Sequence, residues 1–144
     1  MKNNYDYINF HEKLIAIIIY NSYKNKGINF FTPNDFSQQL AYMQHPNDKI
    51  IQPHFHNPVK REVLYTNEVL FIKKGKIRAD LYSDEKEYIC SKILNKGDII
   101  LLVSGGHGFE ILKNTEMIEI KQGPYTGDND KTRFIGISKG EIKF

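Results

Sequence analysis

The chain of 144 residues has the length of one domain, and its content of 40% hydrophobic and 26% charged residues is that of a globular protein. These values argue against extended disorder, a collagen-like repeat and a coiled coil. The formal net charge of +3 is small, so we expect no nucleic-acid partner. The single cysteine, Cys90, cannot form an internal disulfide, and we therefore expect a cytoplasmic protein.

The N-terminal part of the chain contains the longest apolar run, Leu14 to Tyr20. This run is much shorter than the roughly 20 residues of a membrane-spanning helix, and acidic Asp6 and Glu12 precede it where a signal peptide would carry positive charge. We expect no membrane association and interpret the run as a strand. The best helix candidates are residues 1–12 and a turn near Pro33 to Ser37.

Short apolar runs alternate with turn signals along the rest of the chain. Pro46-Asn47-Asp48 predicts a reversal between a strand ending at Gln44 and a returning strand over Lys49 to His56. Six further strands are predicted over Glu68 to Lys73, Lys76 to Tyr82, Tyr88 to Leu94, Asp98 to Val103, Phe109 to Leu112 and Met117 to Gln122. Strands at intervals of about 10 residues are typical of an all-β sandwich or barrel.

Two histidines, His54 and His56, flank Phe55. Residues two apart in a strand point to the same face, so both imidazoles would project side by side. Neutral imidazole is a common metal ligand, which makes the pair a metal-site candidate, with an ordinary polar loop as the alternative.

Glu68 shares its strand phase with Leu70 and Ile72. If that face is the interior, the carboxylate needs a cation, a hydrogen-bonding partner or a raised pKa. The opposite placement, with Val69 and Phe71 inside, stays open because both faces of this run are apolar.

His107 stands between Gly106 and Gly108 at the beginning of a predicted strand. Glycines permit a positive φ and a close approach of the backbone, so the turn either directs this imidazole toward a site or is an exposed glycine-rich loop.

Together these residues resemble the two motifs of the cupin superfamily. His54-Phe55-His56 and the spacing of Glu68 from Gly75 resemble the first motif, G-x5-H-x-H-x3,4-E-x6-G. The stretch from Gly97 to His107 resembles the second, G-x5-P-x-G-x2-H-x3-N. The tail from Glu119 to Tyr125 is similar to the E-x-K-x-G-P-Y tail of small cupin-fold metalloproteins encoded among surface-polysaccharide genes.

The spacing departs from the family pattern at several positions. Eleven residues separate His56 from Glu68 in place of three or four, and Val103 stands where the second motif has proline. Glu62 lies nearer the ordinary spacing but lacks the glycine seven positions later, so Glu68 is the preferred ligand and Glu62 its rival.

The resemblance implies a double-stranded β-helix, an antiparallel jelly-roll barrel, in a single domain over 1–144. Its core would span about 36–123, with N-terminal strands over 1–35 and a tail over 124–144. The implied ligands of one divalent transition metal (Fe, Mn, Ni, Co or Zn) are His54, His56, Glu68 and His107, which leave open coordination positions.

The function expected from this resemblance is binding of a small polar molecule, such as a sugar or sugar-phosphate derivative in polysaccharide biosynthesis, with isomerase or epimerase chemistry. An Fe(II)-type dioxygenase and a non-catalytic ligand-binding protein are the alternatives. Glu62, Gln122 and Tyr125 are the candidates for a catalytic or ligand-contacting role. A homodimer is expected through apolar positions assumed to face outward, Val69, Phe71 and Ile15 to Ile19.

Overall fold

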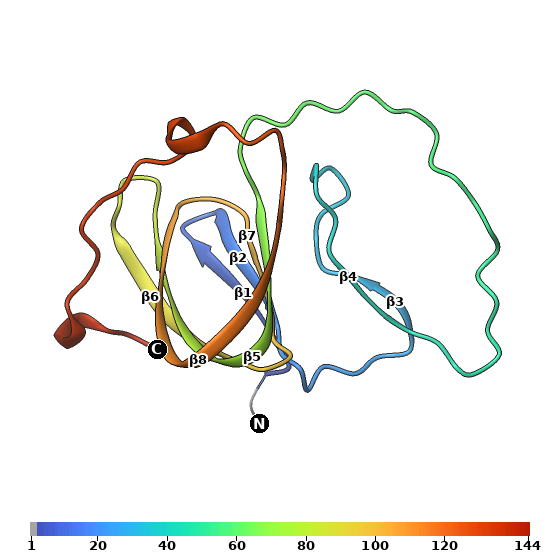
Figure 1. The fold of residues 1–144 in the computed structure, drawn as a ribbon, viewed down its shortest axis with the longest axis horizontal. Helices are drawn as coiled ribbons and strands as arrows, with labels where there is room; N and C mark the ends of the chain where they lie inside the picture. The colour runs from blue at the N-terminus through green and yellow to red at the C-terminus, as the bar shows by residue number, and fades with distance from the viewer. Residues whose placement is uncertain (1–2) are drawn as a thin grey trace. The chain divides into compact units, whose positions relative to one another are not determined.

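The structure of the protein is a computed structural model that describes residues 3–144. The chain forms two compact units, one made of the residues up to Tyr23 together with Thr66–Phe144, the other of Lys24–Tyr65 (Figure 1). Among residues 3–144, none of the helices has the length and apolar character needed to cross a membrane.

The first unit is built on one antiparallel sheet. Its strands are β1 (Tyr5–Phe10), β2 (Lys13–Ile19), β5 (Glu68–Tyr82), β6 (Tyr88–Asn95), β7 (Ile99–Leu102) and β8 (Gly106–Lys121). They lie in the order β1-β2-β7-β5-β6, and β8 pairs with the other side of β5. The expectation of an all-β protein is therefore confirmed.

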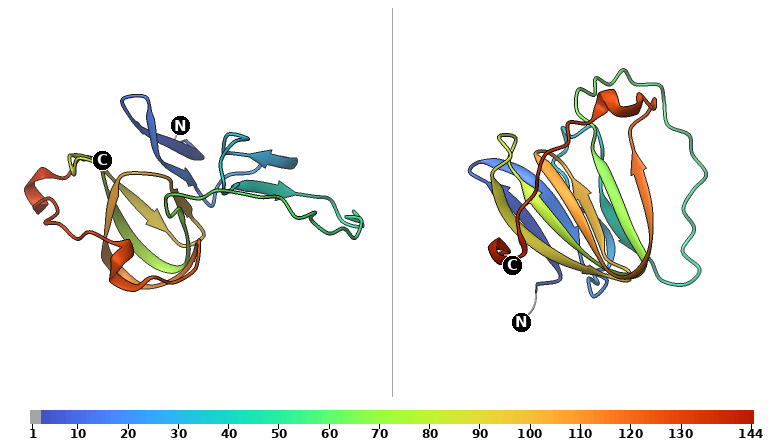
Figure 2. Two further views of the ribbon diagram at one scale, coloured as in Figure 1. Left: turned by 90° about the horizontal axis from the view of Figure 1, so that it is seen from above. Right: turned by 60° about the vertical axis from the view of Figure 1, so that its left-hand side comes forward.

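The long strands β5 and β8 curve together. β5 pairs with β7 over Glu68–Phe71 and with β6 over Lys76–Tyr82. On its other side, β5 pairs with β8 along both of these halves. The register shifts around Gly75, whose φ is +90°. A Cβ on Gly75 would lie 2.3 Å from the carbonyl oxygen of Asn114, so only glycine fits this bend. Figures 1 and 2 show the resulting half-barrel, in which the two ends of β5 curve back toward each other.

The inner face of the curled sheet is apolar. On β5 it carries Leu70 and Ile72 before the bend and Ile77 and Leu81 after it, all at most 3% exposed. The inward side chains change from even to odd positions because the irregularity at Gly75 adds one residue to the alternation. Other strands complete the core with Ile8, Ile15, Ala16, Ile18, Ala79, Leu94, Ile100 and Leu102.

The outer face of the second half of β5 carries a buried polar network. Arg78 donates hydrogen bonds of 2.8 and 3.0 Å to the two oxygens of Asp80, and its third nitrogen lies 2.5 Å from Glu110. Ser91 Oγ donates to Asp80 at 2.5 Å. Burial raises the pKa of Asp80, but these hydrogen bonds and the charge of Arg78 outweigh it and hold the pKa below its ordinary value.

The C-terminal tail packs against the same region. After the short 3-10 helix η1 (Gly127–Asp130), the ring of Phe134 packs edge-on against Tyr82 with centroids 5.0 Å apart. Beyond η2 (Lys139–Glu141), the backbone N–H of Ser91 donates to the carbonyl of Lys143 at 2.6 Å. The tail is thus held to the sheet at Tyr82 and at Ser91, among other places.

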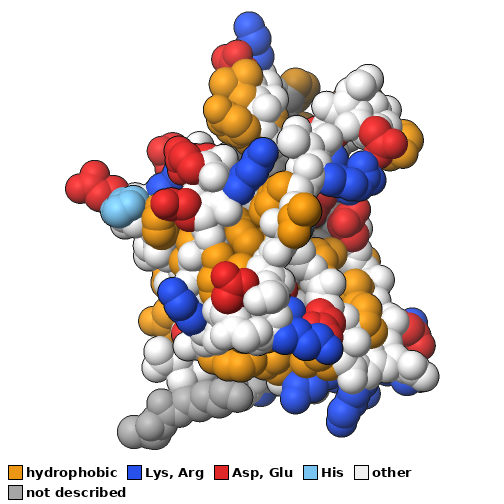
Figure 3. Space-filling model, turned by 90° about the vertical axis from the view of Figure 1, so that its left-hand side faces the viewer, with side chains coloured by type: hydrophobic (Ala, Val, Ile, Leu, Met, Phe, Trp, Pro, Cys, Tyr) orange, Lys and Arg blue, Asp and Glu red, His pale blue; other side chains and the backbone are white. Residues whose placement is uncertain are grey.

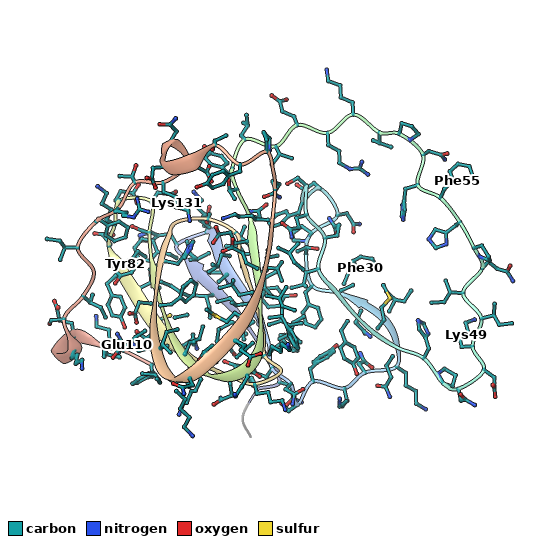
Figure 4. The ribbon with its side chains drawn as sticks, in the orientation of Figure 1. Phe30, Lys49, Phe55, Tyr82, Glu110 and Lys131 are labelled. Carbon is teal, nitrogen blue, oxygen red and sulfur yellow. The ribbon has the colours of Figure 1, made fainter. Side chains whose placement is uncertain are left out.

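The second unit contains a two-stranded hairpin and a long irregular segment. β3 (Gly27–Phe30) pairs antiparallel with β4 (Ala41–Gln44). Within the connection, Thr32 accepts a hydrogen bond from the Leu40 N–H at 3.0 Å. Residues 45–65 have no regular secondary structure and are exposed. Figure 4 shows Phe30 on the hairpin and Phe55 on the irregular segment.

Several sequence-based predictions of elements are wrong. Residues 1–12 contain strand β1 rather than a helix, Pro33 to Ser37 form turns, and Lys49 to His56 is not a strand. Pro53 lacks an N–H for a strand ladder, and β4 pairs with β3 in place of the segment that follows it.

The other differences concern strand ends and exposure. The four runs predicted on either side of Gly75 and of Lys113-Asn114 form two continuous strands, β5 and β8. Val69 and Phe71 lie on the outer face of β5, as expected, because Leu70 and Ile72 face inward. Ile15, Ala16 and Ile18, expected to contribute to the same outer surface, belong to the core instead. The homodimer stays a prediction.

The surface mixes charges of both signs. Figure 3 shows Lys and Arg side chains interspersed with Asp and Glu, with small apolar areas between them, on the face that it draws. Ion pairs occur at several places, including Lys92 with Asp6 at 3.0 Å and Lys13 with Asp84. Charges of opposite sign are thus paired at several places on the surface.

Candidate functional site

Glu68 and His107, far apart in the sequence, meet at the open end of the curled sheet. Oε2 of Glu68 lies 3.1 Å from Nε2 of His107. Glu68 begins the inner face of β5 in phase with Leu70, and His107 stands opposite Leu81 near the other end of β5. Both side chains therefore project from the inner face, and the curl of the sheet closes the distance between them. The Glu68 side chain is 8% exposed and that of His107 31%.

The turn between β7 and β8 positions His107. The Val103 N–H donates to the carbonyl of Ile15 at 2.9 Å, which fixes the chain just beyond β7. Gly105 then adopts a φ of +71°, and a Cβ there would lie 2.1 Å from the carbonyl oxygen of Tyr82. Only glycine permits this approach, so Gly105 sets where β8 begins and hence where the imidazole lies.

Asn67 joins three segments around the pair. Its backbone N–H donates to Gln122 Oε1 at 2.6 Å, and its side-chain amide donates to the carbonyl of Val103 at 2.8 Å. Gln122, expected to contact a ligand, thus uses its carbonyl oxygen to fix the start of β5. Asn67 was not among the predicted site residues, although a polar residue just before an inward carboxylate was a usable signal.

The charge around Glu68 favours its ionised form. The hydrogen bond from His107 lowers the pKa of Glu68; burial acts the other way, and the positive charges of His107, Lys121 and Lys131 add to the lowering. Lys121 stands opposite Glu68 in the register of β5 and β8, with Nζ 3.5 Å from Glu68 and 2.8 Å from Glu119. Lys121 was not among the predicted site residues, because its partner depends on that register.

The other predicted ligands belong to the second unit. The rings of His54 and His56 have centroids 5.4 Å apart, although the segment that carries them is irregular and not the predicted strand. Nδ1 of His54 lies 2.9 Å from the carbonyl of Gln52, to which it can only donate, so Nε2 is the acceptor nitrogen of that ring. His54, His56 and the rival ligand Glu62 are all exposed.

The geometry of the Glu68–His107 pair fits two ligands of one ion. Ligands at about 2.1 Å from an octahedral metal lie about 3 Å apart when adjacent, close to the 3.1 Å between these two atoms. In the structure, the proton that His107 donates to Glu68 lies between these two atoms. Among residues 3–144, no three His, Cys, Asp or Glu side chains gather closely enough to form a metal site. The four-ligand centre thus stays a prediction.

A separate hollow lies between the turn of β1 and β2 and the turn of β5 and β6. Its volume is about 440 Å³, and its lining includes His11, Glu12, Ser83 and Asp84. Lys13, also in the lining, forms an ion pair with Asp84. Lys13 and Asp84 thus neutralise each other within this hollow, whereas Glu68 and His107 join a carboxylate and an imidazole on the inner face of the sheet, which makes that pair the stronger candidate site.

Comparison of the chain with protein-family models, with curated proteins and with solved structures found no significant match.

Proposed function

We propose that the protein is a cytoplasmic, cupin-like metal-binding protein in which Glu68 and His107 hold one divalent transition ion. The observation that carries this proposal is the 3.1 Å approach of a carboxylate oxygen and an imidazole nitrogen on the inner face of the curled sheet. Fe, Mn, Ni, Co and Zn all accept this mixed donor set.

His54 and His56 complete the proposed ligand set on the strength of the sequence motif. The contact of His54 Nδ1 with the Gln52 carbonyl supports this assignment, because metal-ligating histidines commonly donate their second nitrogen to a carbonyl oxygen. That contact leaves Nε2 of His54 able to bind an ion.

The proposed ligand is a small polar molecule such as a sugar or sugar-phosphate derivative. When bound, a divalent ion supplies Lewis acidity toward a carbonyl or neighbouring hydroxyl groups, the chemistry that an isomerase, epimerase or Fe(II)-type dioxygenase uses. Lys121 would provide a hydrogen-bond donor beside the site, and Asn67 with Gln122 would hold the start of β5 in place.

Binding without turnover is the second candidate, and Lys121 favours it. The hydrogen bond to Glu119 raises the pKa of Lys121, and the charges of Glu119 and Glu68 act in the same direction. Lys121 therefore stays protonated, which suits a group that binds an anionic or hydroxylated ligand and does not suit a general base.

Metal analysis of the purified full chain tests the proposal. We expect about one transition ion per chain, and Glu68→Gln and His107→Ala should each lower both metal content and melting temperature, because an ion bound to the native state stabilises it. His45→Ala and Glu116→Gln are matched controls on exposed residues. If the wild-type chain folds and takes up no divalent ion from solution, the metal proposal is wrong.

The same measurement decides between the two acidic candidates. Glu68→Gln should reduce metal retention more than Glu62→Gln, because Glu68 already lies against an imidazole on the inner face of the sheet. The reverse order would assign the ligand to Glu62.

A further inference from the structure

Three strands of the curled sheet have one edge without a strand partner. In the part of the chain that the structure describes, β1 pairs with β2 alone, and β6 and β8 each pair with β5 alone. An unpaired edge presents N–H and C=O groups to any other strand, so folded proteins usually protect it. β1 is six residues long and has a register shift between Ile8 and Asn9. The edge of β6 is covered by the tail, through the hydrogen bond from Ser91 to Lys143.

The edge of β8 combines length with exposed apolar side chains. β8 has 16 residues, and its pairing with β5 is regular over 117–121. Ile118 and Ile120 in this stretch are 48% and 56% exposed. They lie opposite Phe71 and Val69 of β5 and therefore on the outer face of the sheet (Figure 2). A strand edge of this kind is suited to pairing with a strand of another chain.

The charges of this stretch favour a second copy of the chain as the partner. Two copies of one strand pair antiparallel about a two-fold axis, at which one residue lies opposite itself. Axes at Glu119 or Lys121 would set like charges against each other. An axis at Met117 would bring Lys113 opposite Lys121. An axis at Ile118 would leave Glu119 opposite Met117, without an ion pair.

An axis at Ile120 suits both the charges and the apolar side chains. Glu119 of each copy then lies opposite Lys121 of the other, so two symmetric ion pairs form on the inner face. On the outer face the two Ile120 side chains meet, beside Phe71 and Ile118 of both copies. Among the axes considered, this one sets both charged residues of the stretch against opposite charges.

We propose that the protein forms a homodimer in which two copies of β8 pair antiparallel about an axis at Ile120. Lys121, whose ammonium lies 3.5 Å from Glu68, then has Glu119 of the second copy as an additional neighbour. The second copy thus adds a carboxylate next to the lysine of the candidate site. The dimer needs no metal ion, so its tests use a chelating buffer and do not depend on the proposed function.

Sedimentation equilibrium of the full chain tests the dimer. The wild type should have twice the mass of one chain, and Ile120→Asp should have the mass of one, because it sets two carboxylates against each other at the axis. Ile111→Asp, on the same strand at a similar exposure of 54%, is the matched control and should stay dimeric. Circular dichroism checks that each variant is folded. A wild type with the mass of one chain, or equal effects of the two substitutions, would overturn the proposal.

Exchange of the two charges separates the interface from a role within one chain. Glu119→Lys and Lys121→Glu each place like charges opposite one another in a dimer, so each should raise the dimer dissociation constant about tenfold. An equimolar mixture of the two variants restores opposite charges at both contacts, and it should associate about as tightly as the wild type. Mixing does not alter the contacts within either chain. A mixture that associates as weakly as the separate variants would therefore overturn the proposal.

Disulfide formation tests the register. In a Cys90→Ser background, Ile120→Cys places one thiol of each copy at the axis, at a Cα separation that a disulfide spans. Oxidation should join these chains into covalent dimers on a non-reducing gel. Ile118→Cys in the same background lies roughly 13 Å along the strand from its counterpart, which is too far for a disulfide. Equal yields of covalent dimer at the two positions would contradict the axis at Ile120.

Discussion

Lys121 and Glu68 face each other across β8 and β5, and the ammonium lies 3.5 Å from the carboxylate. The site thus already contains a cation at the acidic ligand. A metal ion would have to coexist with this charge or displace it.

Lys121→Met should therefore lower the dissociation constant for Zn²⁺ or Mn²⁺, because it removes a positive charge that repels the ion. Isothermal titration of both chains measures the change. Lys113→Met, an exposed lysine on the same strand, is the control and should leave the affinity as it is. Weaker binding by Lys121→Met would show that the lysine supports the site.

The Asp80 carboxylate should make stability depend on pH at acidic values. Its pKa in the folded chain lies below the ordinary value of 3.8, so its contribution is complete above that value and is lost as pH falls through the folded pKa. Asp80→Asn should lower the free energy of unfolding by about 2 kcal/mol at neutral pH, since it removes one of the two carboxylates that pair with buried Arg78 and leaves Glu110 as the other.

Urea unfolding at neutral pH and at about pH 3 checks this prediction. The gap in stability between the wild type and Asp80→Asn should narrow at the lower pH. Asp128→Asn, whose side chain is 85% exposed, serves as the control. If the difference in unfolding free energy between the two chains stays constant over this pH range, the titration of Asp80 does not contribute to stability.

Gly75→Ala should destabilise the curled sheet by about 2 kcal/mol or more. The substitution forces a side chain into a positive φ and places its Cβ against the backbone of Asn114. Gly108→Ala, on β8 with open space around the added Cβ, should change the unfolding free energy by less than about 0.5 kcal/mol. Equal effects of the two substitutions, measured by urea unfolding, would argue against a tight bend at Gly75.

Ile72→Ala should cost about 2–5 kcal/mol, because Ile72 is fully buried on the inner face and its truncation leaves a cavity. Ile120→Ala removes the same atoms from a side chain that is 56% exposed and should cost much less. Thermal or urea unfolding measures the loss of stability in both variants. Similar losses would mean that Ile72 is not part of the core.

The strand pattern was predictable where local signals and tertiary structure agree. The run Leu14 to Tyr20 became β2, and the phase of Glu68 with Leu70 and Ile72 matches the inner face. The sequence predicts a hairpin turn at Gly75. A hairpin turn and a bend inside one long strand both require a positive φ, so a glycine is compatible with either. Only the pairing of the strands distinguishes the two structures, and the periodicity of the sequence does not show which strands pair.

The site was predictable only in part for the same reason. An inward carboxylate and a glycine-flanked histidine could be recognised one at a time, and the structure brings Glu68 and His107 together. Lys121 reaches Glu68 because the register of β5 with β8 places the two residues opposite each other. Asn67 reaches the β7–β8 turn through its hydrogen bond to the carbonyl of Val103. The placement of His54 and His56 on a strand failed because alternation was assumed in a segment that contains Pro53.

The bend at Gly75 lets one strand serve two neighbours, because β5 pairs with β7 before it and with β6 after it. Damage at this single glycine would therefore reach both halves of the sheet at once. The carboxylate at the start of β5 and the imidazole near its far end would then separate, since only the curl brings them together.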